Sequence, residues 1–176
     1  MKPPSTTLLA LLALVLIATA GCSDRMSWTE IDDAIESRYP GVSHLSTDSL
    51  ATWLTDPTLS EPILLDVREA EEFAISHLYG AYRVAPDDES LPMLQNVSSR
   101  TPIVTYSSVG LRSAALAERL MERGFTRVYN LRGSLFQWAN DGHTLHRGEE
   151  EVHEVHPADE DLGRLLDSSL SFHEAR

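Results

Sequence analysis

Two short apolar runs, each followed at once by a helical pattern, constrain the fold of this chain most strongly. The runs occupy residues 62–67 (Pro-Ile-Leu-Leu-Asp-Val) and 102–106 (Pro-Ile-Val-Thr-Tyr). Each is typical of a strand that is buried on both faces. Because such strands alternate with helical segments, the sequence predicts parallel pairing and one sheet with helices on both faces.

The remaining elements follow from periodicity and from helix stop signals. We expect helices at residues 28–38, 47–54, 69–75, 90–97 and 112–123 and one that runs through Trp138, with strands at 42–45, 62–67, 81–84, 102–106 and 126–130. The expected organisation is a signal peptide over 1–21, a tether and lead-in helix over 22–41, one domain over 42–147 and an acidic tail over 148–176.

The N-terminal segment predicts export and lipidation. Residues Leu8 to Ala18 form an unbroken apolar run of signal-peptide length. Thr19-Ala20-Gly21-Cys22 follows and resembles the lipobox of bacterial lipoproteins, although Thr19 stands where that family usually has Leu. The alternative is ordinary cleavage after Ala20, which would leave Cys22 as a lone thiol. We expect acylation of Cys22, palmitate included, and a stable lipid anchor in the bacterial cell envelope, facing the periplasm.

Charge and lysine content exclude several classes of function. The formal net charge is -13, which disfavours nucleic acid as a partner because phosphates are bound through neutralising Lys and Arg. The single lysine is Lys2, inside the expected signal peptide. A Walker phosphate loop, a Schiff-base lysine and an SxxK serine site all need a lysine ammonium group, and none follows Lys2 in the sequence. No cofactor is expected.

The segment after the second apolar strand is the main candidate site. In a parallel sheet, function lies beyond the carboxyl ends of the strands. Here the loop Ser107-Ser108-Val109-Gly110-Leu111-Arg112 leads directly into a helix, so several backbone N–H groups, a helix N-terminus and a guanidinium can converge on a small oxyanion. The alternative is a tight strand-to-helix connection without a ligand.

An ordered set of motifs resembles the rhodanese-like domain family. It comprises Asp66-Val67-Arg68, Glu72-Phe73, His77-Leu78, Gly80-Ala81, Tyr106 with Gly110, Arg112 and Ser113, and finally Leu131, Gly133 and Trp138. The resemblance implies an α/β domain with a central five-stranded parallel sheet and an active loop after the fourth strand. Ser76 and Ser134 stand where the family commonly has glycine.

The sequence departs from the family at the catalytic position. The resemblance implies a cysteine that carries sulfur as a persulfide at the start of the loop, and this chain has Ser107 there. A serine hydroxyl is far less acidic than a thiol and forms no persulfide. We therefore expect a module that binds a small oxyanion or an envelope protein, without sulfurtransferase activity. The alternative is an enzyme of sulfurtransferase ancestry with altered chemistry at Ser107 to Arg112. A serine hydrolase is disfavoured, because the core histidine His77 is implied to be structural.

Two further groups are interpreted as structural or solvated. Asp66 and Arg68 are expected to bond loop backbone and nearby carboxylates such as Glu72. The pairs His143-x-x-His146 and His153-x-x-His156 have the spacing of Zn or Ni ligands but match no HExxH helix. We expect a solvated acidic tail that contains histidines, with one docked helix and no metal site.

Overall fold

A five-stranded parallel sheet forms the centre of the computed structural model, which describes residues 26–85, 88 and 90–173. Its strands are β1 (Ser43–Leu45), β2 (Ile63–Asp66), β3 (Tyr82–Arg83), β4 (Ile103–Tyr106) and β5 (Val128–Leu131). They lie in the order β1-β5-β4-β2-β3, and every pair is parallel. The two apolar runs of the sequence are therefore the neighbours β2 and β4, with Asp66 opposite Tyr106.

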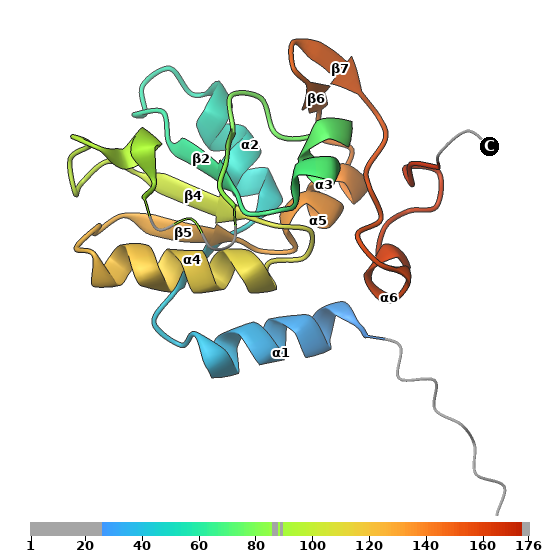
Figure 1. Cartoon of the computed structure of the whole chain (residues 1–176), viewed down its shortest axis with the longest axis horizontal. Coiled ribbons are helices and arrows are strands. Elements are labelled where there is room, and N and C mark those ends of the chain that lie inside the picture. The colour runs from blue at the N-terminus through green and yellow to red at the C-terminus, as the bar shows by residue number, and fades with distance from the viewer. Residues whose placement is uncertain (1–25, 86–87, 89, 174–176) are drawn as a thin grey trace, which may run out of the picture.

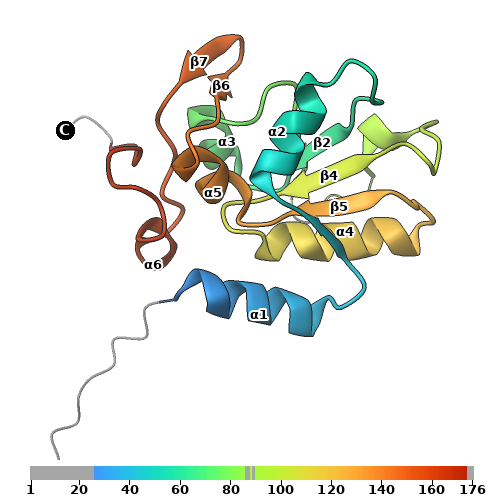
Figure 2. The same ribbon diagram turned by 180° about the vertical axis from the view of Figure 1, so that it is seen from behind.

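Helices cover both faces of this sheet (Figures 1 and 2). They are α1 (Trp28–Arg38), α2 (Thr47–Thr55), α3 (Ala70–Ile75), α4 (Leu111–Glu122) and α5 (Ser134–Asn140). Helix α4 packs along β4 and β5, α1 contacts α4, and α2 contacts α5. Capping fixes where two of them start: Ser27 and Glu30 form a reciprocal capping box on α1, and the Ser46 side chain caps α2.

The predicted fold class is confirmed, and the expected helices and strands are found with shifts of a few residues, with one exception. The expected helix over 90–97 is wrong in type and length: the chain forms only a short 3-10 turn, η1 (Pro92–Leu94). Leu91 before it and Asn96 after it both have positive φ, which prevents a regular helix from continuing in either direction. The expected signal peptide and Cys22 lie outside the described residues.

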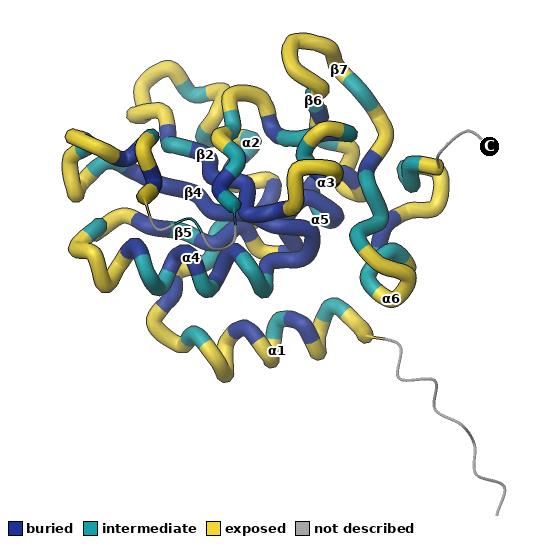
Figure 3. Tube along the Cα trace, in the orientation of Figure 1, coloured by how far each residue is buried: buried dark blue, intermediate teal, exposed yellow. Residues whose placement is uncertain are grey.

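The C-terminal segment is packed against the domain (Figure 3). A two-stranded antiparallel hairpin of β6 (Leu145–Arg147) and β7 (Glu150–Val152) crosses the expected boundary at residue 148, and the short helix α6 (Glu160–Gly163) follows. Val155 and Leu166 are buried in the same apolar cluster as Leu135 and Trp138. The expectation of a solvated tail is thus wrong for this part of the segment, whereas the expectation of one docked helix agrees with α6. No helix within the described ranges is both long and apolar enough to span a bilayer.

Candidate functional site

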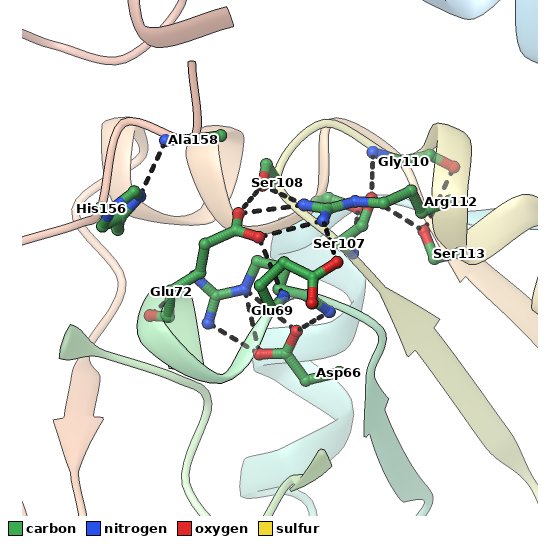
Figure 4. Close-up of polar contacts among 12 residues, drawn as sticks. Asp66, Glu69, Glu72, Ser107, Ser108, Gly110, Arg112, Ser113, His156 and Ala158 are labelled. Carbon is green, nitrogen blue, oxygen red and sulfur yellow. Dashed lines mark hydrogen bonds and ion pairs between the residues drawn. The ribbon is translucent and has the colours of Figure 1, made fainter. Parts of the chain in front are cut away.

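The loop from Ser107 to Gly110 lies at the carboxyl end of β4, as the sequence predicts, and leads into α4 (Figure 4). Gly110 precedes the helix with φ of 108°, a conformation that favours glycine. A Cβ at this position would also approach Ile35 Cδ1 to 3.2 Å. Ser107, Ser108 and Val109 are buried, each with 3% or less of its surface exposed. The hydroxyl at the family's nucleophile position is therefore enclosed.

Two backbone donors of this loop are already used inside the protein. The Ser107 hydroxyl accepts a hydrogen bond of 2.9 Å from the Gly110 N–H. The Ser107 N–H donates to the Ser134 hydroxyl at 3.1 Å, and that hydroxyl donates onward to the Leu131 carbonyl at 3.1 Å. Two N–H groups that could face an oxyanion thus bond to serine side chains instead.

Ser134 contacts the loop at Ser107, although the sequence motifs identify it only as a departure from glycine. It follows Gly133 at the start of α5 and has φ of +50°, in the left-handed region. A non-glycine residue there carries a backbone cost on the order of 1 kcal/mol. The hydrogen bonds of its hydroxyl to both β5 and the loop offset this cost.

Arg112 points onto the side chain of Glu72 rather than into open solvent (Figure 4). Its two terminal nitrogens lie 3.0 and 2.9 Å from the two carboxylate oxygens, which is the bidentate geometry of a strong pair. Ser108 Oγ donates to the same carboxylate at 2.7 Å and accepts from Arg112 at 2.9 Å. Glu72 therefore occupies the place at Arg112 that a bound oxyanion would take.

The hydrogen bonds of Glu72 control its ionisation. Burial by itself would raise the pKa of this carboxyl group. Hydrogen bonds from Arg112, from Ser108 and from the Glu69 N–H outweigh burial and lower the pKa of Glu72 to about 2. The carboxylate is charged at neutral pH and is an internal anion of the site.

Below this network, Asp66 and Arg68 form a fully buried ion pair, with 2.7 Å between Nη2 and Oδ2. Asp66 Oδ1 also accepts from the Arg68 N–H, as expected for an acid at a strand end. Arg68 donates to the backbone carbonyls of Ser76 and Glu72, and its charged partner is Asp66 rather than the Glu72 carboxylate. The pair thereby joins the end of β2 to the middle of α3 and to its C-cap Ser76, and through α3 it positions Glu72.

No general base reaches Ser107 within the described part of the chain. The Ser113 hydroxyl lies 3.4 Å from Ser107 Oγ and bonds more closely to Asn130, at 2.7 Å. His77 Nδ1 lies 2.9 Å from the Phe73 carbonyl oxygen, and its ring stacks on Phe73. The geometry agrees with a structural role for this histidine.

The C-terminal segment completes one side of the site. A pocket of about 530 Å³ lies between α3, Arg112 and the stretch that contains His156, Ala158 and Leu162. Three further carboxylates line it, from Glu69, Glu71 and Asp159. A second pocket of about 520 Å³ lies on the α4 side of Arg112, where Arg38 and Arg119 also line the wall. Sequence reasoning predicted neither the C-terminal wall of the first pocket nor the place of Arg38 and Arg119 in the second, because these residues lie outside the motifs.

The family model described as the rhodanese-like domain matches residues 46–141. The chain is 30% identical over 107 residues to a protein named sulfurtransferase from Allochromatium vinosum, covering 57% of this chain and 92% of that one. It is 32% identical over 75 residues to the Bacillus subtilis protein YqhL, covering 43% of this chain and 59% of YqhL. With the GlpE thiosulfate sulfurtransferase of Actinobacillus pleuropneumoniae it shares 29% identity over 79 residues, which cover 45% and 72% of the two chains.

Solved structures show the same fold. A thiosulfate sulfurtransferase from Pseudomonas aeruginosa superposes with a TM-score of 0.57 at 20% identity, over 66% of this chain and 22% of that one. The BH2092 protein from Bacillus halodurans gives a TM-score of 0.53 at 18% identity, over 69% and 88% of the two chains.

Fold and site together define an α/β domain whose active-loop position follows the β4 strand of a five-stranded parallel sheet. The chain belongs to the rhodanese-like domain family.

Proposed function

We propose that this protein is a non-catalytic member of the rhodanese-like family that serves as a binding module held at a membrane by a lipid on Cys22. One observation carries the proposal: the residue at the nucleophile position is a buried serine whose hydroxyl accepts the Gly110 N–H. A persulfide needs a thiolate, and the only cysteine of the sequence is Cys22, in the segment expected to be acylated. The named activities of relatives favour the alternative, a sulfurtransferase with altered chemistry.

A sulfur-transfer assay separates these two functions. We expect no turnover when the full chain is offered thiosulfate or mercaptopyruvate with cyanide as acceptor. The matched variants are Cys22→Ser, which removes the remaining thiol, and Ser107→Cys, which restores the family's nucleophile. Robust turnover by the Cys22→Ser protein would overturn the proposal, because no thiol would then be present.

The lipid anchor has a direct test of its own. Mass spectrometry of the mature N-terminus should find a chain that begins at Cys22 and carries acyl groups. A mature protein with an unmodified Cys22 thiol would contradict the anchor while leaving the binding module intact. Affinity capture with the intact lipoprotein from the cell envelope is then the experiment that identifies a protein partner.

Binding of a small oxyanion is the second candidate function, and the pocket lined by Arg38, Arg112 and Arg119 favours it. Three arginines and one acid, Glu118, line this pocket, which is a local excess of positive charge in a chain with a net charge of -13. Local donors act over short range, and salt screens the rest of the protein beyond about 8 Å at physiological ionic strength. An anion at Arg112 itself must compete with Glu72, so binding is expected to be weak.

Thermal unfolding in sulfate measures this binding. A ligand that binds only the folded state stabilises it by RT ln(1 + [L]/Kd), about 2.7 kcal/mol at a concentration one hundred times Kd. We expect sulfate to stabilise the wild type more than Arg112→Ala at ionic strength matched with chloride. Equal gains in both proteins would show general salting-out and would remove the oxyanion site.

A further inference from the structure

We propose that Asp48, Asp141 and His143 form a surface binding site for a divalent transition metal such as Zn²⁺ or Co²⁺. The three residues come from the first turn of α2, from the residue after α5 and from the turn that follows it. One potential ligand atom of each lies within 4.8 Å of those of the other two. The site lies apart from the Glu72–Arg112 network and does not depend on the proposed function.

Donor chemistry points to a transition metal rather than to calcium or magnesium. The cluster offers one imidazole nitrogen and two carboxylates, and imidazole suits Zn, Co and Ni, whereas Ca and Mg prefer oxygen ligands alone. His143 Nε2 and Asp48 Oδ1 are 3.3 Å apart. Two donors that are each about 2.1 Å from one ion have this separation at an angle of about 104°, close to tetrahedral.

The imidazole nitrogen Nε2 of His143 faces the Asp48 carboxylate across 3.3 Å without a hydrogen bond of good geometry. His143 Nε2 is buried and makes no hydrogen bond among the described residues, although it faces Asp48. A buried polar atom without a hydrogen bond is costly, and an ion at this position would remove that cost. The Trp138 ring packs against the imidazole, with 4.4 Å between the ring centroids, and the His143 N–H donates to the Trp138 carbonyl.

Asp141 is also held in place before any ion binds. One carboxylate oxygen accepts from Thr47 Oγ1 at 2.5 Å, and the other accepts from the Gln137 amide at 2.7 Å. Hydrogen bonds of this kind orient metal-binding carboxylates. Asp48 is the exposed member of the set, since 87% of its side chain is accessible to solvent. Two ligands are therefore held by protein contacts, and the exposed third has room to adjust to an ion.

Cobalt titration of the full chain in detergent tests the site. All proteins carry Cys22→Ser, because a thiolate would itself bind Co²⁺. We expect one Co²⁺ per chain, a visible d–d absorption band and partial quenching of tryptophan fluorescence through Trp138. Zn²⁺ should displace the Co²⁺ and reverse both signals.

Variants then assign the binding. His143→Gln and Asp141→Asn should each weaken Co²⁺ binding at least about tenfold, since even loss of a partner that orients a ligand costs 10–100-fold. Asp48→Asn, at an exposed position, is the variant that leaves folding least affected. The matched control is His153→Gln, an exposed histidine of the C-terminal segment, which should bind Co²⁺ as the parent does. Absence of binding, binding that survives Asp48→Asn and His143→Gln, or binding lost in His153→Gln would each overturn the proposal.

Discussion

At the scale of single residues, Arg68 places a positive charge in the interior, where it is shielded from water. Its side chain is fully buried, and Asp66, which is equally buried, neutralises it. Burial lowers the pKa of Arg68, but attraction to Asp66 outweighs burial, so the pKa is raised above its ordinary value. Both members of the pair are therefore charged in the folded protein, and neither can lose the other without cost.

We predict that Asp66→Asn lowers the free energy of unfolding by about 3–5 kcal/mol, because it leaves a buried guanidinium without its counter-charge. Urea denaturation measures the loss. The control is Glu36→Gln, which breaks the exposed pair with Arg132 and should cost less than about 1 kcal/mol. Equal effects of the two substitutions would mean that water reaches Arg68.

Glu72 makes stability depend on acid pH. Its pKa is lowered from 4.5 to about 2 in the folded protein, so the charged form is stabilised by folding. That contribution is complete above about pH 4.5 and is lost as the pH falls toward 2. The shift sets an upper bound of about 3 kcal/mol, which solvent around the partly exposed Arg112 reduces.

Glu72→Gln should therefore flatten the stability profile between pH 4.5 and pH 2. Unfolding free energies at a series of pH values, measured on both proteins, give the comparison. The wild type should lose more stability than the variant across this window, and the two curves should run parallel between pH 5 and pH 7. Parallel curves over the whole acid range would show that Arg112 does not hold the carboxylate in solution.

At the scale of elements, the loop from Ser107 to Gly110 is held by hydrogen bonds where β4, α4 and α5 meet. Ser134 connects the start of α5 to Ser107, although its positive φ would suit glycine better. Replacement by glycine removes backbone strain and two hydrogen bonds at once, so the opposing contributions nearly cancel. We predict that Ser134→Gly changes the free energy of unfolding by less than about 1 kcal/mol.

The same substitution should loosen the loop. Because the Ser107 N–H loses its acceptor, its amide hydrogen exchange should accelerate, while exchange in the middle of β4 stays as in the wild type. Nuclear magnetic resonance resolves the two amides. Unchanged exchange at Ser107 would mean that this hydrogen bond does not close the loop.

The elements show what sequence reasoning can reach. Strands β2 and β4 were predictable, because uninterrupted apolar runs admit few structures besides buried strands. The loop and its departure at Ser107 followed from motif order. Contacts between distant residues did not follow, among them the bidentate pair of Arg112 with Glu72 and the cluster of Asp48 with His143. No periodicity records which side chains a tertiary fold brings together.

The hairpin and the C-terminal segment were missed for a related reason. Strands β6 and β7 contain several charged residues and only Leu145 and Val152 as apolar anchors, so they give no strand pattern. In the segment after them, acidic composition predicts a solvated tail, yet a few widely spaced apolar side chains pack against the core. Val155 fills a fully buried place, and Leu166 is 5% exposed.

At the scale of the whole molecule, this segment is part of the domain's core as well as a wall of its site. It returns from the β6–β7 hairpin to the carboxyl end of the sheet, where α6 lies beside α5 (Figures 1 and 2). The Asn140 side chain fixes the return by donating to the Leu165 carbonyl and accepting from the Asp167 N–H. Apolar burial and backbone hydrogen bonds thus act together over residues 155–170.

We predict that a chain shortened to end at His153 loses roughly 3–6 kcal/mol of unfolding free energy, because full burial of one Val or Leu side chain contributes about 1.5–3 kcal/mol. Urea denaturation gives the magnitude, and binding of a hydrophobic dye should report the newly exposed surface around Leu135 and Trp138.

The double variant Val155→Ala, Leu166→Ala tests the same contacts in the full-length chain, and Leu59→Ala, at a side chain 52% exposed, is its control. If the shortened chain and the double variant were as stable as the Leu59→Ala control, the segment would rest on the domain without stabilising it. Residues of this segment also line the pocket beside Arg112. A loss of stability in the double variant would therefore show that the contacts that stabilise the core also hold one wall of the site.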